Sequence, residues 1–214
     1  MPETPDQDAA ENLAPRSRNR TATRDAILVA AKAQLAEHGF AAFGVNAVAR
    51  RALCDKQLVY RYFGGLDGLI DTMGDDLASW VSDRLSAGGA FPAAETYGQR
   101  LDQILQRYLM ALRADPLMQR IIAWEASENA PHVRRLADAR SRALMIWVAK
   151  MRGGLTPRDG LDAPALNAVL VAAIQHLVLC GAATGQCISV PLATDADWLR
   201  IQAMVTRLIR AMHD

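Results

Sequence analysis

Cysteine is scarce in this sequence, and its scarcity excludes several classes of protein. The 214 residues include only Cys54, Cys180 and Cys187, and no Cys-x-x-Cys pair or Cys/His cluster has the spacing of metal ligands. An odd cysteine count in a chain of this length favours a reduced cytoplasmic compartment. The N-terminus also lacks a basic patch followed by an apolar run, so we expect no secretory signal.

Long uninterrupted apolar runs are also missing. Residues 166–183 come closest, but Asn167, Gln175 and His176 interrupt them, the last two in mid-segment. Polar side chains at those depths would be costly in lipid. The run therefore favours a buried helix or a helix–helix interface over a membrane span.

Net charge is small, at +1, but its distribution along the chain is uneven. Residues 1–15 carry four acidic residues and no basic one. Residues 16–63 carry nine basic and three acidic residues, whereas residues 64–214 are nearly balanced. A basic segment of this kind is the footprint expected of nucleic-acid binding, although a merely solvated basic face would give the same count.

Strand periodicity is absent over any useful length, whereas helical periodicity recurs throughout. Residues 1–15 are polar and contain three prolines, so they are predicted to be a disordered tail. The predicted fold class is all-α, with about nine helices and no sheet. The expected helices span residues 23–38, 45–52, 55–62, 66–85, 94–114, 117–127, 131–152, 163–184 and 195–212.

Two short predicted helices, 45–52 and 55–62, follow a longer one and are joined by a tight connection. This is the layout of a helix-turn-helix unit, whose last helix enters the major groove of DNA. Val59 and Phe63 would anchor that helix, because residues four apart share a face. Lys56, Gln57 and Tyr60 would face outward, with chemistry suited to phosphates and base edges, unless they are simply solvated.

The segment 45–69, VNAVARRALCDKQLVYRYFGGLDGL, resembles the signature region of TetR-family regulators. The features that match are a Val-x-x-Val-Ala core, Tyr-Arg-Tyr-Phe at residues 60–63, and Leu69; the resemblance covers about residues 20–70. It implies a helix-turn-helix DNA-binding domain at 16–65 and a helical effector-binding and dimerisation domain at 66–214. Because the bodies of family members diverge, the rest of the chain matches only in helix order.

The resemblance also implies which residues contact DNA. Asn46 corresponds to a base-contacting position of the second helix, and three arginines resemble a basic arm before the first helix. The full set of implied DNA-binding residues is Arg16, Arg18, Arg20, Asn46, Lys56, Gln57, Leu58, Tyr60 and Tyr62. Arg50 and Arg51 could either support phosphate binding or only solvate their helix.

Three positions depart from the family pattern. Leu53 stands where the turn usually has glycine, although leucine takes a positive φ only with strain. The usual Thr or Ser cap of the second helix is replaced around Phe43 and Gly44. Gly64-Gly65-Leu66 replaces Pro-Ser-Lys after the third helix.

The second predicted domain contains aromatic residues and methionines among its apolar stripes. Effector sites are mostly apolar with a few polar groups, and the best candidates for lining one are Tyr108, Trp124, Trp147, Gln175 and His176. Plain core packing is the alternative for each. We expect no cofactor and no metal, because His176 is taken to have no second ligand at helical spacing. Glu125 and Glu128 are expected at the helix surface, and no nucleophile–base pattern indicates an enzyme.

The last two predicted helices, 163–184 and 195–212, carry more apolar surface than one neighbour can cover. The resemblance implies that they pair with their copies in a homodimer, as a near-palindromic operator requires; a monomer that fills its own core is the alternative. The predicted function is a repressor released from its operator by a small, largely apolar effector, although activation stays open. The rival hypotheses are an all-helical enzyme or small-molecule carrier without DNA binding, and a redox sensor using Cys180 and Cys187.

Overall fold

A computed structural model describes residues 13–213 and divides into two compact units. The first unit extends to Met73 and the second begins at Gly74. The predicted tail, residues 1–15, lies outside the described residues except for its last three. The predicted domain limits at 16–65 and 66–214 stay predictions, and the division between the units falls a few residues after the predicted one.

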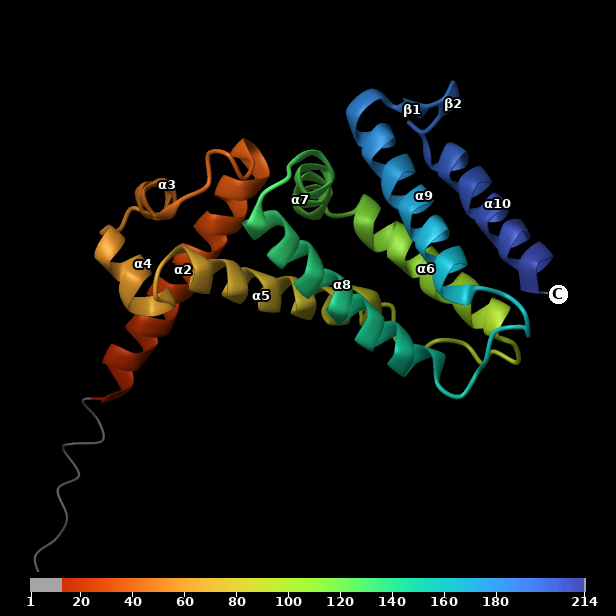
Figure 1. The fold of residues 1–214 in the computed structure, drawn as a ribbon, viewed down its shortest axis with the longest axis horizontal. Coiled ribbons are helices and arrows are strands. Elements are labelled where there is room, and N and C mark those ends of the chain that lie inside the picture. The colour runs from red at the N-terminus through yellow and green to blue at the C-terminus, as the bar shows by residue number, and fades with distance from the viewer. Residues whose placement is uncertain (1–12, 214) are drawn as a thin grey trace, which may run out of the picture. The chain divides into compact units, whose positions relative to one another are not determined.

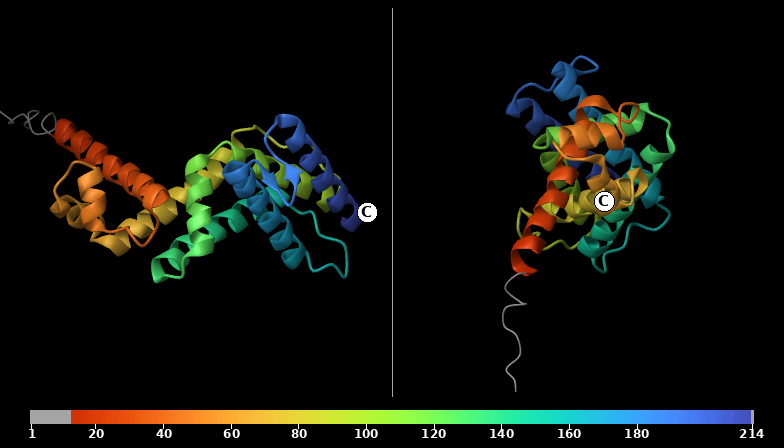
Figure 2. Two further views of the ribbon diagram at one scale, coloured as in Figure 1. Left: turned by 90° about the horizontal axis from the view of Figure 1, so that it is seen from above. Right: turned by 90° about the vertical axis from the view of Figure 1, so that its left-hand side faces the viewer.

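The first unit consists of α2 (Leu13–His38), α3 (Val45–Arg51), α4 (Lys56–Phe63) and the start of α5 (Leu66–Ser86). α2 packs against α3, and α3 packs against α4 (Figures 1 and 2). The helix α2 begins ten residues before the predicted start at residue 23. Pro15 permits this, because proline is tolerated in the first turn of a helix.

The core of the first unit comes from the apolar stripes of its helices. Val48 in α3 and Val59 in α4 are fully buried, as is Leu69 in α5. The stripe predicted for α2 is buried along its length and comprises Ile27, Leu28, Ala31, Leu35 and Ala36. These contacts fix α3 and α4 on a rigid support, so their outward side chains have defined positions.

The second unit contains the end of α5 with α6 (Tyr97–Arg113), α7 (Pro116–Ser127), α8 (Pro131–Arg152), α9 (Ala163–Thr184) and α10 (Asp195–His213). The central helix is α6, which packs against α7, α8, α9 and α10 (Figure 1). Its buried positions recur at helical period, and nearly all the others are half-buried, which suits a helix with neighbours on several sides.

The segment after α9 differs from the prediction. Gln186–Cys187 (β1) and Val190–Pro191 (β2) form an antiparallel hairpin, in which Cys187 pairs with Val190. Ile188 and Ser189 between them have positive φ values of 46° and 63°. The expectation of no sheet was therefore wrong here, whereas the all-α class and the nine helices are confirmed over residues 13–213.

Large apolar surfaces remain uncovered on α9 and α10. The helix α9 is long and apolar enough to cross a membrane by length and composition, and only 17% of its most apolar window is buried. Its exposed stripe consists mainly of small residues with Val169 among them. On α10, Met204, Leu208 and Met212 recur at four-residue spacing and are all exposed.

Candidate functional site

The turn between α3 and α4 is closed by two backbone hydrogen bonds around Leu53. The Leu53 amide donates to the Arg50 carbonyl at 3.3 Å, and the Cys54 amide donates to the Ala49 carbonyl at 3.0 Å. This pattern is a Schellman motif, which places one residue in the left-handed region. That residue is Leu53, with φ of 52° and 94% of its surface exposed. The turn shape is thus retained without glycine.

The helix α4 is capped and anchored as the sequence predicts. The Asp55 carboxylate accepts a hydrogen bond from the Gln57 amide at 2.7 Å and satisfies a free donor of the first turn. Val59 and Phe63 are buried on the inner face. Gly64 ends the helix in the left-handed conformation, with φ of 76°.

The outer face of α4 carries polar and basic side chains. Lys56, Gln57, Tyr60 and Arg61 are exposed, and Asn46 is exposed in the first turn of α3. Leu58 and Tyr62, the other two predicted contacts on α4, are half-buried. Neighbouring polar and cationic groups on an accessible helix face can neutralise phosphates and bond base edges.

Arginines of α2 extend this basic surface. The Arg20 guanidinium lies 6.0 Å from the centre of the Tyr62 ring, and that of Arg24 lies 5.4 Å from the Phe63 ring. Arg16, Arg18 and Arg20 belong to the helix α2, whereas the resemblance implied an arm before it. The side chains of Arg16 and Arg18 lie outside the described residues.

The structure assigns Arg51 a partner within the first unit. Its guanidinium donates to both carboxylate oxygens of Glu37, at 2.7 and 2.5 Å. This hydrogen bond and the charge of Glu37 raise the pKa of Arg51 despite partial desolvation. The pairing gives Arg51 a third role, that of joining α2 to α3 within the first unit, which neither of the two predicted roles includes.

In the second unit, two of the five candidate effector residues come together. The Gln175 side-chain amide donates to the Tyr108 hydroxyl at 2.7 Å, and burial raises the pKa of that hydroxyl. Trp147 instead donates to the Ser86 hydroxyl at 3.2 Å and contacts Phe91. Trp124 is half-buried, and His176 is exposed on α9.

A buried ion pair joins α7 to α8. The Arg140 guanidinium donates to the Glu125 carboxylate at 2.5 and 3.1 Å, and the two side chains are 12% and 5% exposed. The charge of Arg140 lowers the pKa of Tyr108 and that of Glu125 raises it, both by less than burial does. The expectation that Glu125 lies at the helix surface was therefore wrong, because a partner fifteen residues later compensates its buried charge.

Two surface hollows occur elsewhere in the second unit. One, of 450 Å³, is lined from α6 and α10 by residues that include Asp102 and Arg210. The other, of 360 Å³, lies beside Gly154 and His213. Neither hollow is lined by any of the five candidate effector residues, so their assignment stays a prediction.

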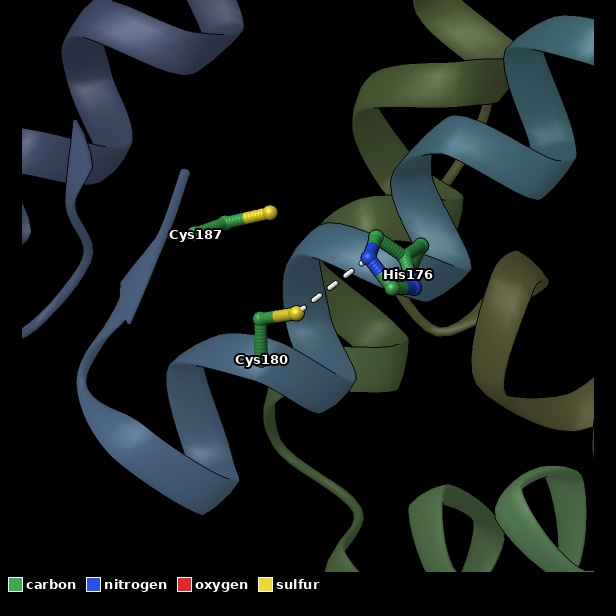
Figure 3. A group of neighbouring side chains, drawn as sticks. All are labelled: His176, Cys180 and Cys187. Carbon is green, nitrogen blue, oxygen red and sulfur yellow. Dashed lines mark hydrogen bonds between the residues drawn. The ribbon is translucent and has the colours of Figure 1, made fainter. Parts of the chain in front are cut away.

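His176 has two potential metal ligands beside it. Cys180 follows it by four residues on α9, and the Cys180 sulfur lies 3.4 Å from the His176 Nε2 atom. Cys187 of β1 completes a cluster of three potential ligands (Figure 3). The expectation that His176 has no second ligand at helical spacing was wrong, because Cys180 lies four residues later on the same face of α9.

The cysteines in this cluster bear on the redox alternative. All three cysteines of the chain are free thiols. Desolvation and the neighbouring Cys187 raise the pKa of Cys180. A raised pKa opposes thiolate formation, but the two sulfur atoms lie within 4.8 Å of each other, so the redox alternative stays a hypothesis.

The fold and the exposed face of α4 define a helix-turn-helix DNA-binding protein with a separate helical body. The family model described as bacterial regulatory proteins, tetR family, matches residues 27–73, from α2 into α5. This DNA-binding segment belongs to the TetR family, and the fold of the chain is that of TetR-family regulators. The sequence resemblance is thereby confirmed.

Solved structures share this fold across nearly the whole chain. A TetR-family transcriptional regulator from Haemophilus influenzae is 15% identical, with 92% of this chain and 99% of that chain covered and a TM-score of 0.60. The regulator FadR from Bacillus subtilis, solved with stearoyl-CoA, is 16% identical, with 86% and 96% covered and a TM-score of 0.61. The fatty acid degradation regulator FadR from Bacillus halodurans is 18% identical, with 87% and 94% covered and a TM-score of 0.59. A search of curated proteins by sequence found no match.

Proposed function

We propose that the protein is a cytoplasmic transcription repressor that binds operator DNA as a homodimer and is released by a small molecule. The observation that carries the proposal is the geometry of α4. Val59 and Phe63 fix its inner face, while Lys56, Gln57 and Tyr60 remain accessible on its outer face. A helix held in this way can enter a major groove, with the basic residues of α2 nearby to contact phosphates.

The homodimer is supported by the uncovered faces of α9 and α10. Small residues on α9 permit a close approach by another helix, and the methionine and leucine stripe of α10 offers apolar surface to bury. A two-fold dimer places two recognition helices on half-sites about 34–36 Å apart, or multiples of this distance.

For the effector, we favour the neighbourhood of Tyr108 and Gln175. The pair offers a hydroxyl and an amide where α6 packs against α9, and burial raises the pKa of the hydroxyl. Such a site suits a largely apolar ligand with one polar group. The relative from Bacillus subtilis was solved with stearoyl-CoA, which combines a long apolar acyl chain with a charged coenzyme A part.

Release would act through α5, which begins in the first unit and ends in the second. An effector that prefers the non-binding state lowers operator affinity by its coupling free energy, typically about 1–3 kcal/mol. This role requires no catalysis, so we propose a regulator and not an enzyme.

The DNA contacts can be tested with duplexes that the wild-type protein selects from a random-sequence library. We expect Lys56→Ala to weaken binding and to lower the slope of log affinity against log salt by about one, the value for one lost phosphate contact. The double variant Lys56→Ala, Tyr60→Phe should bind more weakly still. Lys150→Ala, an equal charge change on an exposed residue of the second unit, should leave both quantities unchanged. Full-strength binding by the double variant would refute the assignment of these contacts.

A further inference from the structure

A histidine and two cysteines converge at the C-terminal end of α9. His176 and Cys180 lie one helical turn apart on α9, and Cys187 reaches them from β1 (Figure 3). The three donor atoms all lie within 4.8 Å of one another. The DNA-binding role uses none of these residues.

We propose that His176, Cys180 and Cys187 form a binding site for one thiophilic d¹⁰ metal ion, Zn²⁺ or Cu⁺. Thiolate sulfur and imidazole nitrogen are the donors that these ions prefer, whereas Mg²⁺ and Ca²⁺ require oxygen ligands, which this cluster lacks. The site goes beyond the proposed function and does not depend on it.

The spacing of the donor atoms suits such an ion. With zinc–sulfur and zinc–nitrogen bonds of about 2.3 and 2.0–2.1 Å, tetrahedral coordination separates sulfur and nitrogen by about 3.6 Å. The Cys180 sulfur and the His176 Nε2 atom are already 3.4 Å apart. Because Cys187 lies within 4.8 Å of both, only a side-chain adjustment is needed to complete the site.

The surrounding backbone holds the hairpin against the end of α9. The Thr184 hydroxyl contacts the Cys180 and Gln186 carbonyls at 3.1 and 2.9 Å, so it ties the helix to β1. After the hairpin, the Leu192 amide donates to the Gly185 carbonyl at 2.8 Å. Cys187 is buried by this arrangement, so the third ligand is positioned before any ion arrives.

The packing of α10 strengthens this support. The Trp198 indole donates to the Leu192 carbonyl at 2.9 Å. Its ring lies so close to Gly181 that a β-carbon there would be 2.8 Å from the Trp198 Cζ2 atom. The chain segments on both sides of Cys187 are therefore fixed to neighbouring helices.

Three protein ligands distinguish this site from a structural zinc site, which normally has four. Cu⁺ can be bound by the three donors alone, whereas tetrahedral Zn²⁺ leaves one position for water or an added ligand. In the single chain His176 is exposed on the same face of α9 as Val169, so solvent reaches the site at that side before a partner helix covers it. We therefore expect an exchangeable ion whose binding releases protons from the cysteine thiols.

The test uses the full chain, purified metal-free under reducing, oxygen-free conditions. Zn²⁺ is titrated in competition with a chromogenic zinc chelator, and Cu⁺ is titrated in competition with a copper(I) chelator. We expect one equivalent of at least one ion per chain. Cys180→Ser, Cys187→Ser and His176→Gln should each weaken binding at least about tenfold, because even residues that only support metal ligands are worth about 10–100-fold. Cys54→Ser changes the remaining thiol, in the first unit, and should bind like the wild type.

Co²⁺ provides a measurement on the unaltered chain, so the test does not depend on whether the variants fold. Thiolate coordination should give sulfur-to-cobalt charge-transfer absorption in the near ultraviolet, which added Zn²⁺ displaces if zinc occupies the site. The proposal is overturned if the wild-type chain gives no such absorption with Co²⁺ and retains neither Zn²⁺ nor Cu⁺ against its chelator. The proposal would also be overturned if Cys54→Ser lost as much metal affinity as the three ligand variants.

Discussion

Leu53 adopts a backbone conformation that usually requires glycine. Its Cβ atom is brought close to backbone oxygen in the left-handed region, at a cost of about 1–2 kcal/mol. Since the side chain is 94% exposed, packing compensates little of this cost. The two hydrogen bonds of the α3–α4 turn must therefore hold the conformation against local strain.

We expect Leu53→Gly to stabilise the protein by about 0.5–1 kcal/mol, after allowing for the greater freedom of glycine in the unfolded chain. Urea unfolding followed by circular dichroism measures the change. Val29→Gly removes another exposed aliphatic side chain in the same unit, but from within α2, and should destabilise by about 0.5 kcal/mol. If Leu53→Gly were destabilising as well, the strain argument would be wrong.

Single residues were predictable where the signal is local. Asp55 as a cap and Val59 with Phe63 as anchors depend on neighbours within one or two turns, and all three predictions are confirmed. The burial of Glu125 depends on Arg140 in another helix, and the position of Cys187 depends on a hairpin. Sequence spacing does not reveal such contacts, although the pair His176 and Cys180 could have been identified from it.

Two arginine–glutamate pairs join helices in similar geometry but at different depths. Glu125 in α7 pairs with Arg140 in α8 inside the second unit, whereas Glu37 and Arg51 join α2 to α3 near the surface. The Glu37 and Arg51 side chains are 42% and 30% exposed, so water solvates either charge when the other is removed. The burial of each pair should therefore decide how much stability is lost when one partner is removed.

Glu125→Gln should destabilise the protein by about 3–5 kcal/mol, because it leaves the Arg140 charge buried without a counter-ion. Glu37→Gln makes the same chemical change at the exposed pair and should cost less than about 1 kcal/mol. Chemical denaturation of both variants under identical conditions provides the comparison. Equal losses of stability in the two variants would contradict the claim that burial sets the cost of breaking each ion pair.

At the scale of elements, long periodic helices were predicted best. The bounds of α8 and α9 agree with the predicted ranges 131–152 and 163–184, since proline and glycine mark their ends. The start of α2 was missed because residues 13–22 lack an apolar stripe. The hairpin was not predicted because two-residue strands are too short to show alternation. In addition, isoleucine rarely takes a positive φ, as Ile188 does here.

For the whole molecule, the proposed dimer makes the clearest prediction. Met204→Asp with Leu208→Asp puts two charges on the exposed stripe of α10, and we expect the dimer dissociation constant to rise at least tenfold, or about 1.4 kcal/mol. Sedimentation equilibrium measures the change. Met145→Asp, at an exposed methionine of α8, should leave the oligomeric state unaltered. A double variant that remains as fully dimeric as the wild type would exclude α10 from the interface.

The sequence predicted the helical class and the outer face of α4, because both follow from local periodicity. It could not show which of the candidate effector residues lie together. Tyr108 and Gln175 lie 67 residues apart in sequence and meet only when α6 packs against α9. The ion pair of Glu125 and Arg140 was not foreseen, because no local pattern distinguishes a buried glutamate from a solvated one.

The uncovered stripes of α9 and α10 have a consequence for gene control. If two protomers must meet before either can hold an operator firmly, occupancy at low abundance rises with the square of the protomer concentration. Halving the concentration of this protein would then lower operator occupancy by more than half. The amount synthesised would thus become a control input alongside the effector.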